Sequence, residues 1–204
     1  MNSDMEQITV AVVYHSGYGH TARQARAIEE GVEQVEGVKA VLLNVDEAQK
    51  NWEALEQAEA IIFGAPTYMG SASAGFKAFM DASSTAFFKS AGKNKLAAGF
   101  TNSASRSGDK LSTLIQFAIF AAQHGMHWIS LGLEPGNNSS EGSEEEINRL
   151  GFFLGAGAQS NSDQGADVAP PQSDLATARH LGQRVAETAV QFARGRQVAA
   201  EVTG

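Results

Sequence analysis

The sequence predicts an α/β fold in which a five-stranded parallel sheet is covered by helices on both faces. Short apolar runs alternate with amphipathic helical patterns along most of the chain. Such runs are typical of strands buried on both faces, and their alternation with helices is typical of parallel sheets with right-handed crossovers. With 204 residues the chain is long enough to bury a substantial core, so we expect a single domain over residues 1–204.

The expected elements follow one another in a regular order. Strands are expected at residues 8–14, 38–45, 60–64, 96–101 and 127–131. Helices are expected at residues 22–35, 76–83, 111–122 and 175–192, where apolar residues recur at helical spacing. Two stretches break this pattern. Residues 46–59 fit only a short helix, and residues 132–173 form a long loop, which in a compact domain is usually functional or disordered.

The first strand ends in a loop of small and hydroxyl-bearing residues that runs into a helix. Its sequence is His15-Ser16-Gly17-Tyr18-Gly19-His20-Thr21-Ala22. Free N–H groups and the dipole at a helix start favour an anion, and Ser16, Tyr18 and Thr21 can add hydroxyl donors. No lysine follows the glycines, so the loop is not a Walker loop. It can hold one terminal phosphate, act as a G-x-G-x-x-A dinucleotide fingerprint, or be an ordinary tight turn.

Two further loops narrow this choice. Residues 64–71 follow the third strand, where Pro66 stiffens the turn and Tyr68 and Met69 offer surface for stacking against a ring. Residues 101–109 follow the fourth strand and are small and polar, with Arg106 as their cation. Ligands in such folds bind outside the carboxyl ends of the strands, so the loops should converge. Together they favour a mononucleotide with a planar ring over a dinucleotide.

Composition excludes several classes of function. The net charge of −8 argues against a nucleic-acid partner, which would need a basic surface. No run approaches the roughly 20 apolar residues of a membrane span, and the polar residues 1–7 do not fit a secretory signal. The absence of cysteine excludes disulfides, thiolate catalysis and cysteine metal sites, and we expect no metal. We therefore expect a cytoplasmic protein.

These motifs together resemble a known family. Residues 14–20, residues 61–70 and His124-Gly125-Met126 are similar to those of the flavodoxin-like NAD(P)H:quinone oxidoreductases related to the tryptophan-repressor-binding protein. Gly155-Ala156 and the helix start at Gln172 are similar as well, so the resemblance covers nearly the whole chain. It implies a flavodoxin-like three-layer sandwich.

The resemblance also implies an FMN cofactor, NADH or NADPH as donor, a quinone acceptor and a dimer or tetramer. The residues it places against the phosphate are Ser16, Tyr18, Gly19, His20 and Thr21. Those it places along the isoalloxazine are Pro66, Thr67, Tyr68, Met69 and Gly70, with Asn102, Ser103 and the residues to Gly108 on the other side. His124 would approach the open face of the ring, where nicotinamide and quinone alternate, and is the expected catalytic residue.

The chain departs from the family pattern at three places. Tyr68 and Met69 stand where the family usually has Arg and Phe. Residues 106–110 replace a glycine triplet followed by Gln-Glu, and the segment between the second and third strands is shorter. The first two departures bear on substrate contacts, and the third bears on subunit packing.

We therefore expect an FMN-dependent NAD(P)H oxidoreductase that reduces quinones by two electrons through hydride transfer. The apolar residues 150–154 and the long loop before them favour a homo-oligomer. The alternatives are a one-electron carrier of the flavodoxin type, which docks on redox proteins, and an interaction module without flavin.

Overall fold

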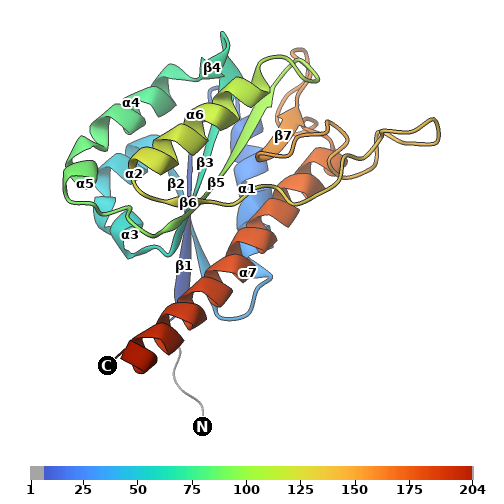
Figure 1. Cartoon of the computed structure of the whole chain (residues 1–204). Coiled ribbons are helices and arrows are strands. Elements are labelled where there is room, and N and C mark those ends of the chain that lie inside the picture. The colour runs from blue at the N-terminus through green and yellow to red at the C-terminus, as the bar shows by residue number, and fades with distance from the viewer. Residues whose placement is uncertain (1–6, 204) are drawn as a thin grey trace.

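A central parallel sheet with helices on both faces organises the protein (Figure 1). The computed structural model describes residues 7–203; residues 1–6, for which no secretory signal is expected, lie outside this range. The strands are β1 (Ile8–Tyr14), β2 (Val38–Asn44), β3 (Ala60–Tyr68), β4 (Ser71–Ala72), β5 (Leu96–Ser103), β6 (His127–Trp128) and β7 (Ala156–Gln159). The sheet order is β2-β1-β3-β5-β6, and the short β4 pairs antiparallel with β3. The predicted fold class is confirmed.

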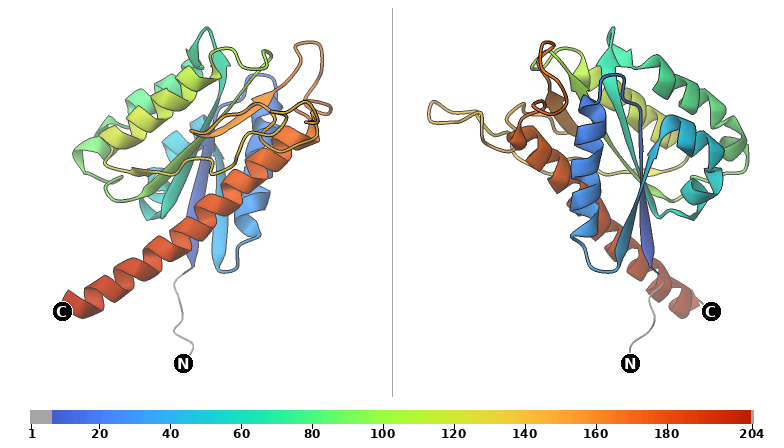
Figure 2. Two further views of the ribbon diagram at one scale, coloured as in Figure 1. Left: turned by 45° about the vertical axis from the view of Figure 1, so that its right-hand side comes forward. Right: turned by 180° about the vertical axis from the view of Figure 1, so that it is seen from behind.

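The fifth strand differs from the prediction, because two separate segments form it. β6 pairs with the start of β5 through Leu96 and Ala97, whereas β7 pairs with its end from Phe100 onward. The strand expected at residues 127–131 therefore stops at Trp128. The Ile129 N–H still donates to the Ala97 carbonyl of β5 at 2.7 Å, but beyond it the chain leaves β5, and the Leu131 N–H donates to the Phe153 carbonyl at 2.9 Å. Residues 129–155 are an insertion, part of which projects as a loop away from the sheet (Figures 1 and 2).

Alternate side chains of β1 enter two separate cores. Val10 and Val12 pack on the face covered by α1 (His20–Glu33) and α7 (Gln172–Thr203). Ala11 and Val13 pack on the other face, with Phe76 from α4 (Ala74–Ala82) among their neighbours. This period of two is what a strand buried on both faces requires, and it explains the continuous apolar run in the sequence.

The other helices lie on the α4 face. They are α2 (Val45–Lys50), α3 (Trp52–Gln57), α5 (Ser84–Phe88) and α6 (Lys110–Gln123). The short helix expected within residues 46–59 is thus a pair of short helices. Asn44 begins α2 with a capping box, since its side chain accepts from the Glu47 N–H while Glu47 accepts from the Asn44 N–H. Within residues 7–203, no helix combines the length and the apolar character that crossing a bilayer requires.

Candidate functional site

A cavity of about 600 Å³ opens at the carboxyl ends of the strands, within the range of sites that hold a cofactor. Loops after β1, β3, β5 and β7 form its walls. The lining residues are Ser16, Gly17, Tyr18, His20, Thr21, Pro66, Tyr68, Asn102, Ser103, Ala104, Ser160, Ser162, Gln164 and Gly165. The three loops singled out by sequence therefore converge as expected. The set contains eight of the thirteen residues expected to bind the cofactor.

The loop after β1 presents the start of α1 to this cavity. Gly19 precedes the helix at φ = 90°, a left-handed conformation that favours glycine. The Ser16 hydroxyl oxygen accepts from the N–H groups of Gly19 at 3.1 Å and Ala22 at 3.2 Å, which fixes the turn. His20 and Thr21 line the cavity, and N–H groups in the first turn of a helix have no intrahelical acceptor. This end of the cavity is suited to an anion.

Two tyrosines form an aromatic wall beside this loop. The rings of Tyr18 and Tyr68 meet edge to face, with centroids 6.5 Å apart. A Cβ atom on Gly17 would lie 2.7 Å from the Tyr68 hydroxyl, so a larger residue there would have to displace the Tyr68 side chain. Burial, followed by the proximity of Tyr18, raises the pKa of Tyr68. The Tyr18 side chain is 80% exposed and leaves this wall open to an incoming ring.

The opposite wall was not predicted from the sequence. It is the loop after β7, which contributes Ser160, Ser162, Gln164 and Gly165. The His20 ring bonds the Gln164 carbonyl at 2.8 Å, and Arg23 donates to the Ala166 carbonyl at 2.9 Å. These contacts attach the loop to the start of α1. The only signal for this wall in the sequence was the run of small residues near Gly155-Ala156, which is too short and too weakly apolar to predict the strand β7.

Five of the expected cofactor-binding residues lie outside the cavity lining. Thr67 is directed into the interior, where its hydroxyl bonds those of Thr101 at 2.7 Å and Thr113 at 2.8 Å. Met69 and Gly70 form a turn with positive φ, and the Met69 side chain is fully exposed. Gly108 also has positive φ and is exposed. Gly19 shapes the turn through its backbone, while the other four support or flank the cavity.

The loop after β5 is held by two charged residues. Arg106 forms an ion pair with Glu144 of the insertion at 2.5 Å, and its side chain is about half exposed. Hydrogen bonds from Arg106 and then Arg149 lower the pKa of Glu144. The second charged residue, Lys110, is completely buried beneath the loop. The ion pair with Glu144 therefore neutralises part of the Arg106 charge, so Arg106 attracts a bound phosphate less strongly.

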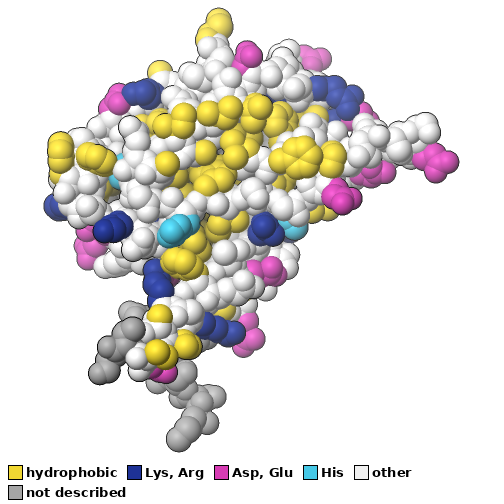
Figure 3. All heavy atoms as spheres, in the orientation of Figure 1, with side chains coloured by type: hydrophobic (Ala, Val, Ile, Leu, Met, Phe, Trp, Pro, Cys, Tyr) yellow, Lys and Arg dark blue, Asp and Glu magenta, His cyan; other side chains and the backbone are white. Residues whose placement is uncertain are grey.

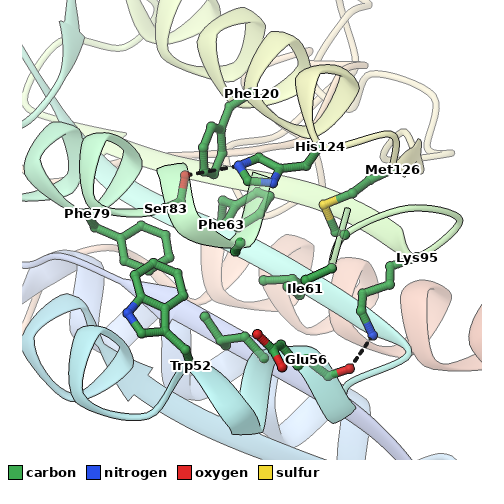
Figure 4. Close-up of a pocket in the computed structure, with 14 residues that line it drawn as sticks. Trp52, Glu56, Ile61, Phe63, Phe79, Ser83, Lys95, Phe120, His124 and Met126 are labelled. Atoms are coloured by element: carbon green, nitrogen blue, oxygen red, sulfur yellow. Dashed lines mark hydrogen bonds between the residues drawn. The ribbon is translucent and has the colours of Figure 1, made fainter. Parts of the chain in front are cut away.

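The structure does not bring His124 to this cavity within one chain. It ends α6 at the amino ends of the strands, because α6 begins beside the end of β5 and runs back along the sheet. It borders a small apolar pocket near Phe79 and Phe120 (Figure 4). Its Nε2 bonds the Ser83 hydroxyl at 3.0 Å, and burial lowers its pKa. The expected catalytic role cannot come from the same chain's cavity.

Comparison with known proteins gives consistent results. Residues 39–132 match the model of the NADPH-dependent FMN reductase family. The chain is 46% identical over 185 residues to "Flavodoxin FldP" of Pseudomonas aeruginosa, covering 89% of this chain and 96% of that protein. It is 32% identical over 207 residues to "NAD(P)H dehydrogenase (quinone)" of Geobacter sulfurreducens, covering 91% of this chain and 99% of that protein.

Solved structures agree with these relatives. A flavodoxin, WrbA-like protein from Agrobacterium tumefaciens superposes with a TM-score of 0.71 at 41% identity, covering 91% of this chain and 99% of that one. An archaeal flavodoxin superposes with a TM-score of 0.62 at 22% identity, which shows the shared fold. The fold is therefore common to these proteins and this chain.

Proposed function

Because this chain belongs to the flavodoxin-like NAD(P)H:quinone oxidoreductase family, we propose that it binds FMN and uses NADH or NADPH to reduce a quinone by two electrons. The observation that carries this proposal is the cavity itself. A helix start suited to a phosphate and a pair of tyrosines suited to a flat ring face the same space. Neither feature alone would select a flavin.

The lining residues fit the chemistry of FMN. The amides and hydroxyls of Ser16, His20 and Thr21 would hold the phosphate, without help from a cation, since no lysine or arginine within residues 7–203 lines the cavity. Pro66 and the two tyrosines would hold the ring. Asn102, Ser103 and Ser160 supply polar groups on the other side, and the Ser160 hydroxyl donates to Asn102 Oδ1 at 2.8 Å.

The chain's own residues would then bind, orient and expose the cofactor. When bound, FMN supplies the acceptance of a hydride from reduced nicotinamide and the delivery of two electrons to an acceptor. The protein must leave one face of the ring open, and the exposed Tyr18 and Tyr68 border that opening. Amides pointing at a site where negative charge develops stabilise it without reorganisation.

A second copy of the chain would complete the site. Leu111, Ile115 and Ile119 are each more than 40% exposed and recur every fourth residue along α6, where Figure 3 shows a continuous hydrophobic band. Apolar patches of this kind mark interaction surfaces. We propose a homo-oligomer that packs through this face, and His124 keeps its proposed role only by reaching the cavity of another copy.

Changing the α6 face should break this assembly. Ile119→Lys places a charge in the band at its most exposed residue, so the mass measured by light scattering is expected to fall by at least half at micromolar concentration. Lys77→Met, on the exposed surface of α4, is the control and should leave the mass unchanged. A wild-type chain that is already a monomer would contradict the proposal.

The oxidoreductase proposal is tested by mixing FMN-loaded protein with NADH or NADPH in an anaerobic stopped-flow instrument. Loss of the visible flavin absorbance within seconds, followed by its return on adding a quinone, is the expected result. If neither nicotinamide reduces the flavin within minutes, the chain is not an NAD(P)H oxidoreductase.

Failure of both NADH and NADPH to reduce the flavin would favour a one-electron carrier. A specific observation supports this alternative, because a relative that is 46% identical over most of both chains bears the name flavodoxin. The acidic net charge of −8 also fits docking on a basic redox protein. A one-electron carrier would accept electrons from a reductase protein. The two functions are therefore distinguished by whether free NADH or NADPH reduces the bound flavin without such a protein.

The phosphate end of the cavity is tested at Thr21, which is buried at the start of α1. Thr21→Asp adds a negative charge, and like charges about 6 Å apart near a surface repel by about 3 kcal/mol. We expect FMN to bind roughly 100-fold more weakly, by fluorescence titration, than to Thr21→Asn. The neutral variant has the same shape and separates charge from size. Equal affinity of the two variants would place the phosphate elsewhere.

A further inference from the structure

Lys110 is a fully buried lysine whose charged group lies under one wall of the cavity. It is the first residue of α6, and its side chain turns back beneath the loop that follows β5. Its Nζ donates to the Ser103 hydroxyl at 2.6 Å and to the Ser105 carbonyl. The carbonyl oxygens of Ser103 and Arg106 lie within 3.4 Å as well. Four oxygens of one short loop therefore surround a single nitrogen.

This arrangement favours the charged form of the lysine. An ammonium group has three N–H donors and no acceptor, whereas a neutral amine has only two donors. Carbonyl oxygens that converge on one point repel one another unless a positive donor lies between them. Ser103 lines the cavity, so the bond from Lys110 fixes a residue of the wall directly.

The charges around Lys110 come from three parts of the chain. Asp174 of α7 attracts its proton, and Arg149 of the insertion repels it. Arg106, whose carbonyl it contacts, and Asp109, which precedes it, belong to its own loop. Burial, the largest influence, lowers the pKa of Lys110 to about 8. Carboxylates and guanidinium groups do not titrate near this pH, so Lys110 is the group in this cluster that changes charge there.

We propose that Lys110 is a positioning residue of the flavin site, whose buried ammonium group holds the Ser103–Arg106 loop in its binding shape and places positive charge beside it. The inference rests on the proposed binding of FMN. It concerns a position where the chain departs from the pattern of the family it resembles, within residues 106–110. Lys110 is not among the residues that line the cavity, so this role is an indirect one, exerted through the loop.

The proposal has a consequence for pH that needs no mutation. An anionic ligand stabilises a nearby positive charge and raises its pKa, so linkage requires the affinity for FMN to fall as pH rises through the pKa of the free lysine. We expect the dissociation constant to increase severalfold between pH 7.5 and 9.5. The FMN phosphate, with a second pKa near 6, is dianionic throughout this range. The raised pKa of Tyr68 keeps its phenol neutral.

The experiment measures FMN affinity, by quenching of flavin fluorescence, for the wild type, Lys110→Met and Lys110→Gln across this pH range. Lys93→Met, on the exposed turn before β5, is the matched control. At pH 7.5 we expect about tenfold weaker binding for Lys110→Met than for the control, because the loop carbonyls lose a charged donor. Lys110→Gln keeps a donor without the charge and should lie between the two. Both variants should lose the pH dependence.

A second readout separates charge from loop shape. The affinity for reduced FMN, which carries a negative charge on the ring, should fall more in Lys110→Met than the affinity for oxidised FMN. The midpoint potential of the bound flavin should therefore become more negative in this variant. A potential that stays at the wild-type value would limit Lys110 to the shape of the loop and overturn the electrostatic part of the proposal.

The outcomes distinguish this proposal from the one on which it rests. If the wild type binds no FMN, the proposed function fails. If the wild type binds FMN with an affinity that is constant from pH 7.5 to 9.5, and Lys110→Met binds as well as Lys93→Met, the role of Lys110 is wrong although the function stands. If Lys110→Met does not fold, Lys110→Gln and the wild-type pH profile decide the matter.

Discussion

Replacing Arg149 with methionine is expected to destabilise the protein by about 4 kcal/mol, because it leaves a buried carboxylate without its cation. The Arg149 guanidinium contacts both carboxylate oxygens of Asp174, at 2.8 Å and 2.9 Å. Only 2% of the Asp174 side chain is exposed. Asp174 also accepts from the Gln159 N–H, and the Gln159 side chain donates to the Ala104 carbonyl. The ion pair thus joins α7, the end of β7 and the wall of the cavity.

The free energy of unfolding from urea titration measures this effect. Arg179→Met is the matched control, since it also removes an arginine from an ion pair that involves α7, but Arg179 and its partner Glu30 are both partly exposed. Exposed pairs contribute at most about 1 kcal/mol, so the control should change stability little. A loss in Arg149→Met no greater than that of the control would show that the pair does not hold the insertion to the body of the protein.

Replacing Gly31 with alanine is expected to cost about 3 kcal/mol, because α1 and α7 cross in close contact. A Cβ atom on Gly31 would lie 1.9 Å from the Arg179 carbonyl oxygen, and one on Gly182 would lie 2.1 Å from that of Ile28. In both cases the obstacle is backbone, so the helices themselves must move apart. The two glycines face each other across the same crossing and set its spacing.

The control for this prediction is another glycine of α7. Apart from its chain neighbours and the backbone of its own helical turns, no atom of the described residues lies within 4 Å of the position that a Cβ on Gly195 would take, so Gly195→Ala should raise stability by a few tenths to 1 kcal/mol through its better helix propensity. Thermal unfolding of both variants compares them directly. If the two substitutions shift the melting temperature in the same direction, the crossing is not as tight as the structure shows.

The sequence was sufficient for the first four parallel strands of the sheet and for three walls of the cavity. Strands buried on both faces produce long apolar runs, as in β1, and the carboxyl end of each strand must point to the same edge. Once the strands were identified, Ser16, Tyr68 and Asn102 had to lie near one another. Local patterns and the topology of parallel sheets together carried this part of the prediction.

Features that depend on long-range contacts were beyond the sequence. β7 has only four residues and follows a long insertion. Its pairing with β5 therefore leaves no pattern in the sequence that would predict it. Thr67 lies in a turn motif that suggested a ligand contact, yet two threonines from distant segments bond its hydroxyl. The burial of Lys110 was not predictable either, because a lysine at a helix start is expected at the surface unless the conformation of the loop above it is known.

A titration of the purified wild-type chain with FMN tests the central claim, that the cavity between the β1, β3, β5 and β7 loops is a flavin site. We predict saturable quenching of flavin fluorescence at one FMN per chain, with a shift of the visible absorption bands as the ring leaves water for the tyrosine wall. Unchanged flavin fluorescence and an unshifted spectrum in the presence of excess protein would contradict it.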